Sequence, residues 1–321
     1  MADYDVFNGD ADGLCALHQL RLHEPRPSRL ITGAKRDIAL LRQVQPERGD
    51  RLTVLDVSLD VNRAALLRAL HAGARCEYFD HHFPGEVPVH PALEAHIECV
   101  PDTCTSLIVD RYLGGRYRAW AVVAAFGDNL PQVAAIAAVP LALGLPQLEL
   151  LRRLGECLNY NAYGDSVADL HFHPEALYLR LRQYEDPFEF AAQDPAVEHL
   201  QRGYDEDMRR AAQTEPLLDS GGHLAVVLPD AAWARRVSGP WANRLAQLSP
   251  QRAHAVMVRK GRTLGVSLRA PLARPEGADR LARQFAGGGG RPGAAGIDAL
   301  PEDEFPRLLR AFAEHFSDAA A

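Results

Sequence analysis

The chain has 321 residues and a formal net charge of −7, with 47% hydrophobic and 24% charged residues. This length suggests two domains, and the composition is that of a globular protein with a sizeable core. The acidic balance argues against a broad basic face that tracks long DNA or RNA, because neutralisation of phosphates by Lys and Arg supplies much of that affinity.

The hydropathy pattern and the cysteine usage indicate the cellular compartment. The sequence contains no run of about 18 apolar residues, the minimum for a membrane span, and its acidic N-terminus does not resemble a signal peptide. The five cysteines are scattered and form no CxxC pair. This usage is typical of reduced thiols, so we expect a cytoplasmic protein that does not bind membranes.

The first part of the chain alternates predicted strands with predicted helices. The strand patterns cover residues 4–7, 30–32, 51–57 and 76–79, and the helical patterns cover 14–22, 37–44 and 62–72. Such alternation predicts an α/β fold with a mostly parallel sheet flanked by helices. In these sheets, functional residues collect at the carboxyl ends of the strands.

The remainder of the chain divides into a helical region and a second α/β domain. Helical spacing dominates residues 122–181, and strand patterns return at 223–228, 253–258 and 263–268. A glycine-rich loop at 287–290 is followed by a predicted helix at 304–316. We therefore expect a catalytic domain over 1–185, a helical linker over 186–220 and a smaller α/β domain over 221–321, with the active site in the cleft between the two domains.

Acidic residues and histidines follow three of the predicted strands and one apolar helical run. They are Asp10, Asp12, Asp56, Asp80, His81, His82 and Asp128. Because the carboxyl ends of parallel strands converge, these side chains would share one site, where crowded carboxylates require cations. Oxygen ligands with imidazole suit Mn²⁺ or Mg²⁺. Two such ions about 3.5–4 Å apart can activate water and clamp a phosphate, so the pattern predicts a phosphoesterase.

Four short motifs, in this order, resemble those of the DHH phosphoesterase family. They are Asp-Ala-Asp-Gly at 10–13, Leu-Asp-Val-Ser at 55–58, Asp-His-His at 80–82 and Gly-Asp-Asn at 127–129. Ser-Leu-Arg at 267–269 and the glycine-rich segment 287–296 are similar to the DHH-associated domain of oligonucleotide-cleaving members. The resemblance therefore covers most of the chain, and it is to the two-domain nano-RNase and RecJ-like type.

The resemblance implies a set of metal ligands. Asp10 would bind one ion and Asp12 the other, Asp56 would bridge the two, and His81 and Asp128 would complete the second ion. The ions would be Mn²⁺, with Mg²⁺ or Co²⁺ as alternatives.

It also implies a catalytic pair and a substrate-binding set. Asp80 and His82 would be catalytic, with His82 facing the phosphate. The substrate-binding residues would be Thr105, Ser106, Arg269, Gly288, Gly289, Gly290 and Arg291. In that set the glycine amides would cradle a phosphate, and the arginines would pair with it.

Two positions depart from the family pattern. Many members have a histidine four residues before Asp10, where this chain has Val6, so the first ion would lack a ligand. The glycine run usually ends in histidine, where this chain has Arg291. Arginine does not titrate near neutrality, so Arg291 would clamp charge and would not shuttle protons.

We expect a two-metal phosphodiesterase that hydrolyses short oligonucleotides or dinucleotides, such as pGpG or pApA, to mononucleotides. The alternatives are a nucleoside bisphosphate phosphatase, an exonuclease on longer single strands, and a nucleotide-binding regulator that has lost catalysis. The net charge argues against the exonuclease. Whether the chain forms a homodimer is left open by the sequence.

Overall fold

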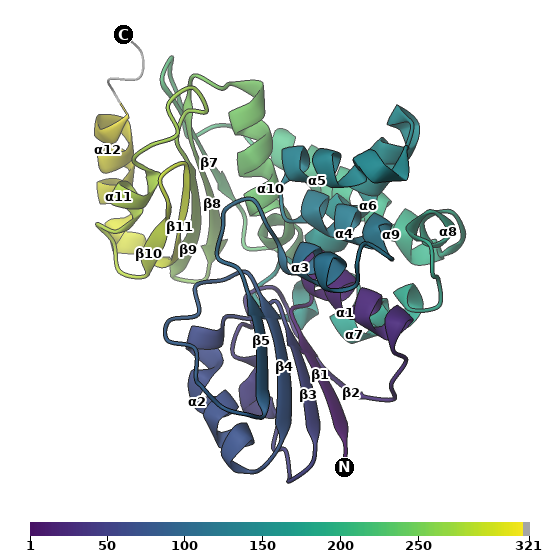
Figure 1. Cartoon of the computed structure of the whole chain (residues 1–321). Coiled ribbons are helices and arrows are strands. Elements are labelled where there is room, and N and C mark those ends of the chain that lie inside the picture. The colour runs from purple at the N-terminus through teal and green to yellow at the C-terminus, as the bar shows by residue number, and fades with distance from the viewer. Residues whose placement is uncertain (317–321) are drawn as a thin grey trace. The chain divides into compact units, whose positions relative to one another are not determined.

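The first sheet of the protein is parallel throughout. The computed structural model describes residues 1–316, and the chain divides into two units, Met1–Gly203 and a second that begins at Tyr204. The first unit contains a five-stranded sheet in the order β2-β1-β3-β4-β5, with every neighbouring pair parallel (Figure 1). Its strands are β1 (Asp3–Phe7), β2 (Arg29–Ile31), β3 (Arg51–Leu55), β4 (Arg75–Asp80) and β5 (Leu93–Ile97). The predicted parallel sheet is thus confirmed.

The edge strand β5 was missed by the sequence analysis. Its sequence, Leu-Glu-Ala-His-Ile, carries a charged residue and a histidine, and none of its residues is fully buried. By contrast, β3 has four buried residues in a row, as expected for a strand covered on both faces. The apolar pattern therefore identified the central strands and could not identify the exposed edge.

Helices cover both faces of this sheet. On one face, α2 and the short helix η1 pack on Val54 and Tyr78, while α1 packs with α3 and α4. Among the helices that the structure describes, none is both long and apolar enough to cross a lipid bilayer. The helices of the first unit are α1 (Ala11–His23), η1 (Leu40–Gln43), α2 (Leu59–His71), α3 (Thr105–Tyr112), α4 (Arg118–Gly127), α5 (Pro131–Ala138), η2 (Val139–Leu141), α6 (Leu145–Ala162), η3 (Val167–Asp169), α7 (Pro174–Leu181) and α8 (Pro187–Gln193), and α9 (Pro195–Ala212) continues into the second unit.

The predicted helix at 37–44 is wrong, because only the single turn η1 forms there. The side chain of Asn62 explains the difference. Its amide nitrogen donates to the carbonyl oxygen of Ile38 at 2.6 Å, and its oxygen accepts from the amide of Leu41 at 3.2 Å. These backbone groups are therefore satisfied by α2 and do not need a longer local helix.

The second unit contains a mixed six-stranded sheet in the order β10-β11-β9-β8-β7-β6. Only β7 and β8 are parallel, and the other neighbouring pairs are antiparallel. The core lies between this sheet and α11 and α12, with Phe312 fully buried. The elements are β6 (Leu218–Asp219), β7 (His223–Leu228), α10 (Ala232–Leu248), β8 (Ala253–Lys260), β9 (Thr263–Arg269), α11 (Ala278–Ala282), β10 (Gly288–Arg291), β11 (Ala294–Pro301), η4 (Glu302–Glu304) and α12 (Phe305–His315).

The prediction of a glycine-rich loop at residues 287–290 is wrong. Gly288–Arg291 form the edge strand β10. Gly288, Gly289, Gly290 and Arg291 pair with β11 as β10. A Cβ added to Gly288 would lie 1.9 Å from the carbonyl oxygen of Ala282. Gly290 has φ +141°, which side chains rarely adopt, and its added Cβ would lie 2.5 Å from Ala295. Glycine is needed here because other backbone segments approach closely.

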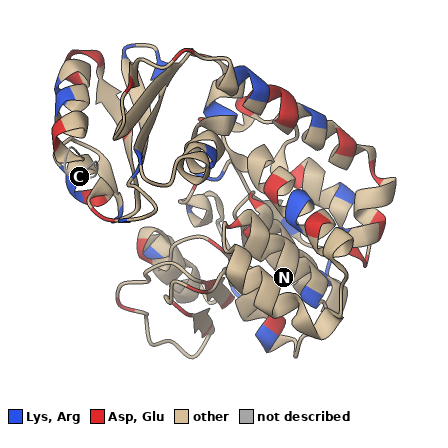
Figure 2. Ribbon diagram, turned by 90° about the horizontal axis from the view of Figure 1, so that it is seen from above, with Lys and Arg blue, Asp and Glu red and all other residues tan. Residues whose placement is uncertain are grey.

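Acidic and basic residues are interspersed along the helices in the ribbon of Figure 2. Helix α6 gives an example, because Arg152 pairs with Glu149 and Glu156 on its exposed side. These helices therefore carry residues of both signs along their length.

A close approach of α4 and α6 depends on two glycines. A Cβ added to Gly155 would lie 2.1 Å from the carbonyl oxygen of Val123, and one added to Gly127 would lie 2.8 Å from that of Gly155. This contact fixes the end of α4, where Asp128 follows, against the part of α6 that carries Asn159.

We expect Gly155→Ala to lower the free energy of unfolding by about 1–3 kcal/mol or more, because the new methyl group would overpack the α4–α6 contact. Urea denaturation followed by circular dichroism measures the change. Gly239→Ala is the matched control: it also lies inside a helix, and nothing comes within 4 Å of the added Cβ. Equal stabilities of the two variants would contradict this account of the helix contact.

Candidate active site

The acidic residues predicted at separate strand ends are brought together by the first sheet. Asp56 follows β3, and Asp80 is the last residue of β4, with His81 directly after it. The Nε2 atom of His81 lies 3.4 Å from Asp56 Oδ1 and 4.0 Å from Asp128 Oδ2. Asp128 comes from the end of α4, so a helical segment completes a cluster that the strands begin.

Two sets of side chains in this cluster could hold a metal ion. They are Asp12 with His81 and Asp128, and Asp56 with His81 and His82; in each set the ligand atoms lie within 4.8 Å of one another. Both sets use His81. Asp80 also presents Oδ2, a buried oxygen with no hydrogen-bond partner among the described residues. Carboxylates and imidazole of this kind fit a divalent ion such as Mn²⁺ or Mg²⁺.

Asp12 is held by the start of helix α3. Its two carboxylate oxygens accept the amides of Thr105 and Ser106, each at 2.7 Å, and the hydroxyl of Thr105 donates to Asp56 at 3.2 Å. Amides at a helix N-terminus stabilise a carboxylate. Thr105 and Ser106 are both fully buried, which argues against the predicted contact with substrate and favours a role in positioning the carboxylates.

Asp56 combines a strained backbone with a carboxyl group whose pKa is shifted. Its backbone has φ +57°, a left-handed conformation that is uncommon outside glycine, and its amide donates to the carbonyl oxygen of Phe79 at 3.0 Å. Burial, followed by the charges of Asp10 and Asp12, raises the pKa of Asp56 well above its usual value. A strained residue with a perturbed pKa is typical of a functional site.

Asp10 is paired with a lysine that the sequence analysis did not identify. Lys35 Nζ lies 2.5 Å from Asp10 Oδ2, 3.4 Å from Asp128 Oδ1 and 3.3 Å from Asn159 Oδ1. Burial alone would lower the pKa of Lys35, but the Asp10 carboxylate raises it well above its usual value. Burial would likewise raise the pKa of Asp10, and the Lys35 ammonium outweighs this and lowers it. Both groups are therefore ionised.

His82 is oriented by Asp80. The Nδ1 atom of His82 lies 2.7 Å from Asp80 Oδ1, which also accepts the amide of His81 at 2.9 Å. Burial would lower the pKa of His82, but the hydrogen bond to Asp80 and its charge raise it. The side chain of His82 is 43% exposed, so Nε2 is free to meet a ligand.

The predicted substrate residues of the second unit lie on β9 and β10. Arg269 Nε donates to Asn243 Oδ1 of α10 at 2.7 Å, and its Nη1 donates to its neighbour's carbonyl oxygen at 2.8 Å. The amide of Gly288 donates to Phe285 at 3.0 Å, so it is not free for a phosphate. Gly289 has open space beside it, and Arg291 is exposed. Asn243 was missed because α10, a continuous helix that contains Pro240, was not predicted from the sequence.

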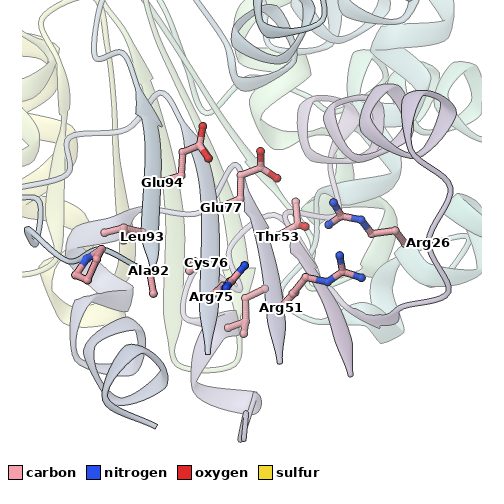
Figure 3. Close-up of a pocket in the computed structure, with 11 residues that line it drawn as sticks. Arg26, Arg51, Thr53, Arg75, Cys76, Glu77, Ala92, Leu93 and Glu94 are labelled. Carbon is pink, nitrogen blue, oxygen red and sulfur yellow. The ribbon is translucent and has the colours of Figure 1, made fainter. Parts of the chain in front are cut away.

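A separate cavity lies on the first unit away from the carboxylate cluster. It has a volume of about 840 Å³ and is lined by polar and apolar residues of β3, β4 and β5 and of the segments that precede β2 and β5. Figure 3 shows Arg51 and Arg75 at the starts of β3 and β4, with Glu77 and Glu94 farther along the sheet. Since Asp56 and Asp80 lie at the opposite ends of the same strands, this cavity is not part of the candidate active site.

No protein-family model and no curated protein sequence matches the chain. Solved structures do. An exonuclease RecJ bound to manganese matches over 99% of this chain and 90% of its own, with 16% identity and a TM-score of 0.61. The DHH domain of a protein described as a member of a ribosomal protein family matches over 98% of this chain and 86% of its own, with 12% identity and a TM-score of 0.62. PggH of Vibrio cholerae, a pGpG-specific phosphodiesterase, matches over 98% of this chain and 99% of its own, with 14% identity and a TM-score of 0.56.

The likeness to these structures concerns the fold. A parallel five-stranded sheet flanked by helices and a second, mixed sheet are the arrangement of DHH-domain proteins. The resemblance that the four motifs indicated is thereby confirmed for the fold. The roles of individual residues remain predictions.

We expect Asp56→Asn to raise the melting temperature of the metal-free protein by roughly 2–6 °C, at about 2–4 °C for each kcal/mol. Asparagine tolerates a left-handed backbone, so the variant removes charge repulsion and keeps the local conformation. Because the folded protein raises the pKa of Asp56, the ionised carboxylate opposes folding at neutral pH. The increase in melting temperature should become smaller as the pH falls through the raised pKa of Asp56. It should vanish below the ordinary pKa of 3.8.

Thermal unfolding in EDTA between pH 4 and pH 8 provides the measurement. Asp60→Asn is the control, because Asp60 is 56% exposed and pairs with Arg63 on the surface of α2, where such pairs contribute little. Equal melting temperatures of Asp56→Asn and the wild type at every pH would contradict charge repulsion at Asp56.

Proposed function

We propose that this protein is a divalent-metal-dependent phosphodiesterase that hydrolyses dinucleotides and other very short oligonucleotides to mononucleotides. The observation that carries the proposal is the convergence of Asp12, Asp56 and Asp128 on His81, each with a carboxylate oxygen within 4.8 Å of a nitrogen of that imidazole. The fold shared with an exonuclease RecJ and with the pGpG-specific phosphodiesterase PggH supports the class of reaction.

The acidic character of the chain supports a short substrate. Its net charge is −7, and a long single strand would bring many phosphates against a surface of mixed charge. A dinucleotide brings few phosphates, which local groups can bind. Because all five cysteines are free thiols, we also propose that the protein works in a reducing, cytoplasmic environment.

The metal would be held by the carboxylates and the imidazole of the first unit. Asp12, Asp56, His81 and Asp128 are the ligands we assign, and Mn²⁺ is the ion we expect. A divalent ion held by these residues would neutralise charge on the phosphoryl oxygens and would lower the pKa of a bound water, so that hydroxide forms at neutral pH. Thr105 and Ser106 keep the Asp12 carboxylate aimed at the site through their amides.

His82 and Asp80 supply the proton chemistry in this proposal. Asp80 accepts from Nδ1 of His82 and so fixes the orientation of the ring. When the ring is protonated, the form that Asp80 favours, His82 also carries a proton on Nε2 and can donate it to a phosphoryl oxygen or to the leaving ribose oxygen. Transfer to the leaving oxygen completes hydrolysis, since the attacking water supplies the new P–O bond and regenerates a proton.

Phosphate binding is the role we assign to the second unit. Arg269, oriented by Asn243, offers a guanidinium, and Arg291 offers a second one at the end of β10. The amides of Gly289 and Gly290 complete the set, while that of Gly288 is already bonded.

With Mn²⁺, purified protein should consume dinucleotides such as pGpG or pApA faster than nucleoside bisphosphates, pyrophosphate or long single strands. We expect His81→Ala to lower kcat/KM by at least about 100-fold, because it removes a ligand shared by both candidate ion sets. His71→Ala, an exposed residue at the end of α2, is the control. Preferential consumption of a nucleoside bisphosphate would indicate a phosphatase, and binding of nucleotides without turnover would indicate a regulator.

Replacement of Arg291 by Ala should raise KM for a dinucleotide about 10-fold with kcat nearly unchanged, the effect expected when binding energy is lost equally from substrate and transition state. Steady-state kinetics measures both constants. Arg310→Ala, an exposed arginine on α12, should leave them unaltered. A fall in kcat with constant KM would show that Arg291 acts in the chemical step instead.

A further inference from the structure

Lys35 occupies the centre of the carboxylate cluster. It lies between β2 and η1, and its ammonium nitrogen is within 3.4 Å of oxygens of Asp10, Asp128 and Asn159. An ammonium has three N–H donors and no acceptor, so these oxygens match its bonding capacity. The Tyr163 ring lies 5.7 Å from the same nitrogen and adds a cation–π contact.

Asp10, the carboxylate that Lys35 contacts most closely, is fully engaged within the protein. Its Oδ1 accepts the amides of Asp12 and Gly13, each at 3.0 Å, as the N-cap of α1. Its Oδ2 accepts from Lys35 at 2.5 Å. The carboxylate therefore already has a cation and two amides, and none of the three candidate ion sets in the described chain includes it.

The remaining ligands are enough for one ion. The two candidate sets of this cluster share His81. Because one histidine nitrogen binds one ion, the two sets cannot both be complete at the same time. His81 lies between Asp56 and Asp128, at 3.4 Å and 4.0 Å from their oxygens. His81 can therefore complete one ion site, either with Asp12 and Asp128 or with Asp56 and His82.

The choice of lysine is unusual for this chain. Of its 35 lysine and arginine residues, only Lys35 and Lys260 are lysines. Arginine is a broad planar fork, while the lysine ammonium is a compact point charge on a flexible stem. A compact charge bound by several oxygens resembles a metal ion in size and in the ligands it requires. The one lysine of the first unit stands where that property matters.

We propose that the Lys35 ammonium takes the place of one metal cation, so that the site binds one divalent ion where the sequence pattern predicted two. The proposal rests on the proposed function, since it assumes that the cluster binds metal. Lys35 binds Asp10 and Asp128 and supplies a positive charge beside the ion. Asp10 becomes a positioning residue for Lys35 and is no longer a metal ligand.

Counting bound ions tests the proposal without reference to activity. Purified full-length protein is dialysed to equilibrium against Mn²⁺, and the bound metal is measured by inductively coupled plasma mass spectrometry. We expect one ion per chain for the wild type and two for Lys35→Met, which keeps the length of the side chain and removes its charge. Lys260→Met, at the end of β8 in the second unit, should remain at one.

Electron paramagnetic resonance of the wild type gives an independent readout. One Mn²⁺ per chain gives an isolated six-line spectrum, while two neighbouring ions give a spin-coupled signal. This spectrum decides the question even if Lys35→Met does not fold, because it uses the native chain alone.

The outcomes separate this inference from the proposed function. Two coupled ions in the wild type would overturn the inference and leave the metal-dependent function standing. A folded Lys35→Met variant that still binds one ion would also overturn it. A wild type that binds no Mn²⁺ would overturn the proposed function, and the inference with it.

Discussion

The repulsion between buried carboxylates is the constraint on which the first unit depends. Asp10, Asp12, Asp56 and Asp128 come from distant parts of the sequence and meet where water cannot screen them fully. Carboxylates in such a place must be protonated, hydrogen-bonded or neutralised by cations. The protein uses the last two means, through the α3 amides at Asp12 and the ammonium at Asp10. What these leave uncompensated, chiefly at Asp56, is what a divalent ion would neutralise.

This arrangement opposes stability and so requires rigid surroundings. Asp56 combines a left-handed backbone with a carboxyl group whose ionised form is disfavoured by burial and by the neighbouring carboxylates. The neighbouring structure holds it through the backbone bond to Phe79 and the hydroxyl of Thr105. Similarly, the glycine contact between α4 and α6 fixes Asp128 near Asn159. Strain of this kind persists only where the surrounding fold determines the conformation, and functional sites are where it collects.

The two units bring different chemistry to the proposed reaction. The first unit supplies carboxylates and imidazoles that suit a hard cation, and the second supplies arginines and a glycine strand that suit a phosphate. The replacement of a loop by the edge strand β10 matters for this division. Some backbone N–H and C=O groups of a strand are hydrogen-bonded to the neighbouring strand and cannot bind a ligand. Arg269 and Arg291 are therefore the main phosphate ligands of the proposal.

The sequence by itself determined the parallel sheet, its central strands, the shared location of Asp56 and Asp80, and the resemblance whose fold the solved structures confirm. These follow from local rules, because apolar runs make buried strands and parallel strands end at one edge. The exposed strand β5, the short turn η1 and the glycine strand β10 depend on neighbours that no local pattern describes.

The position of Lys35 among the carboxylates was determined only by the tertiary structure. It stands in a segment with no periodic pattern, and its partners lie 25, 93 and 124 residues away in the sequence. Electrostatic contacts over such separations exist only once the sheet and helices have packed. The sequence could therefore specify which acids meet, while the packing of α1, α4 and α6 decided which cation already stands among them.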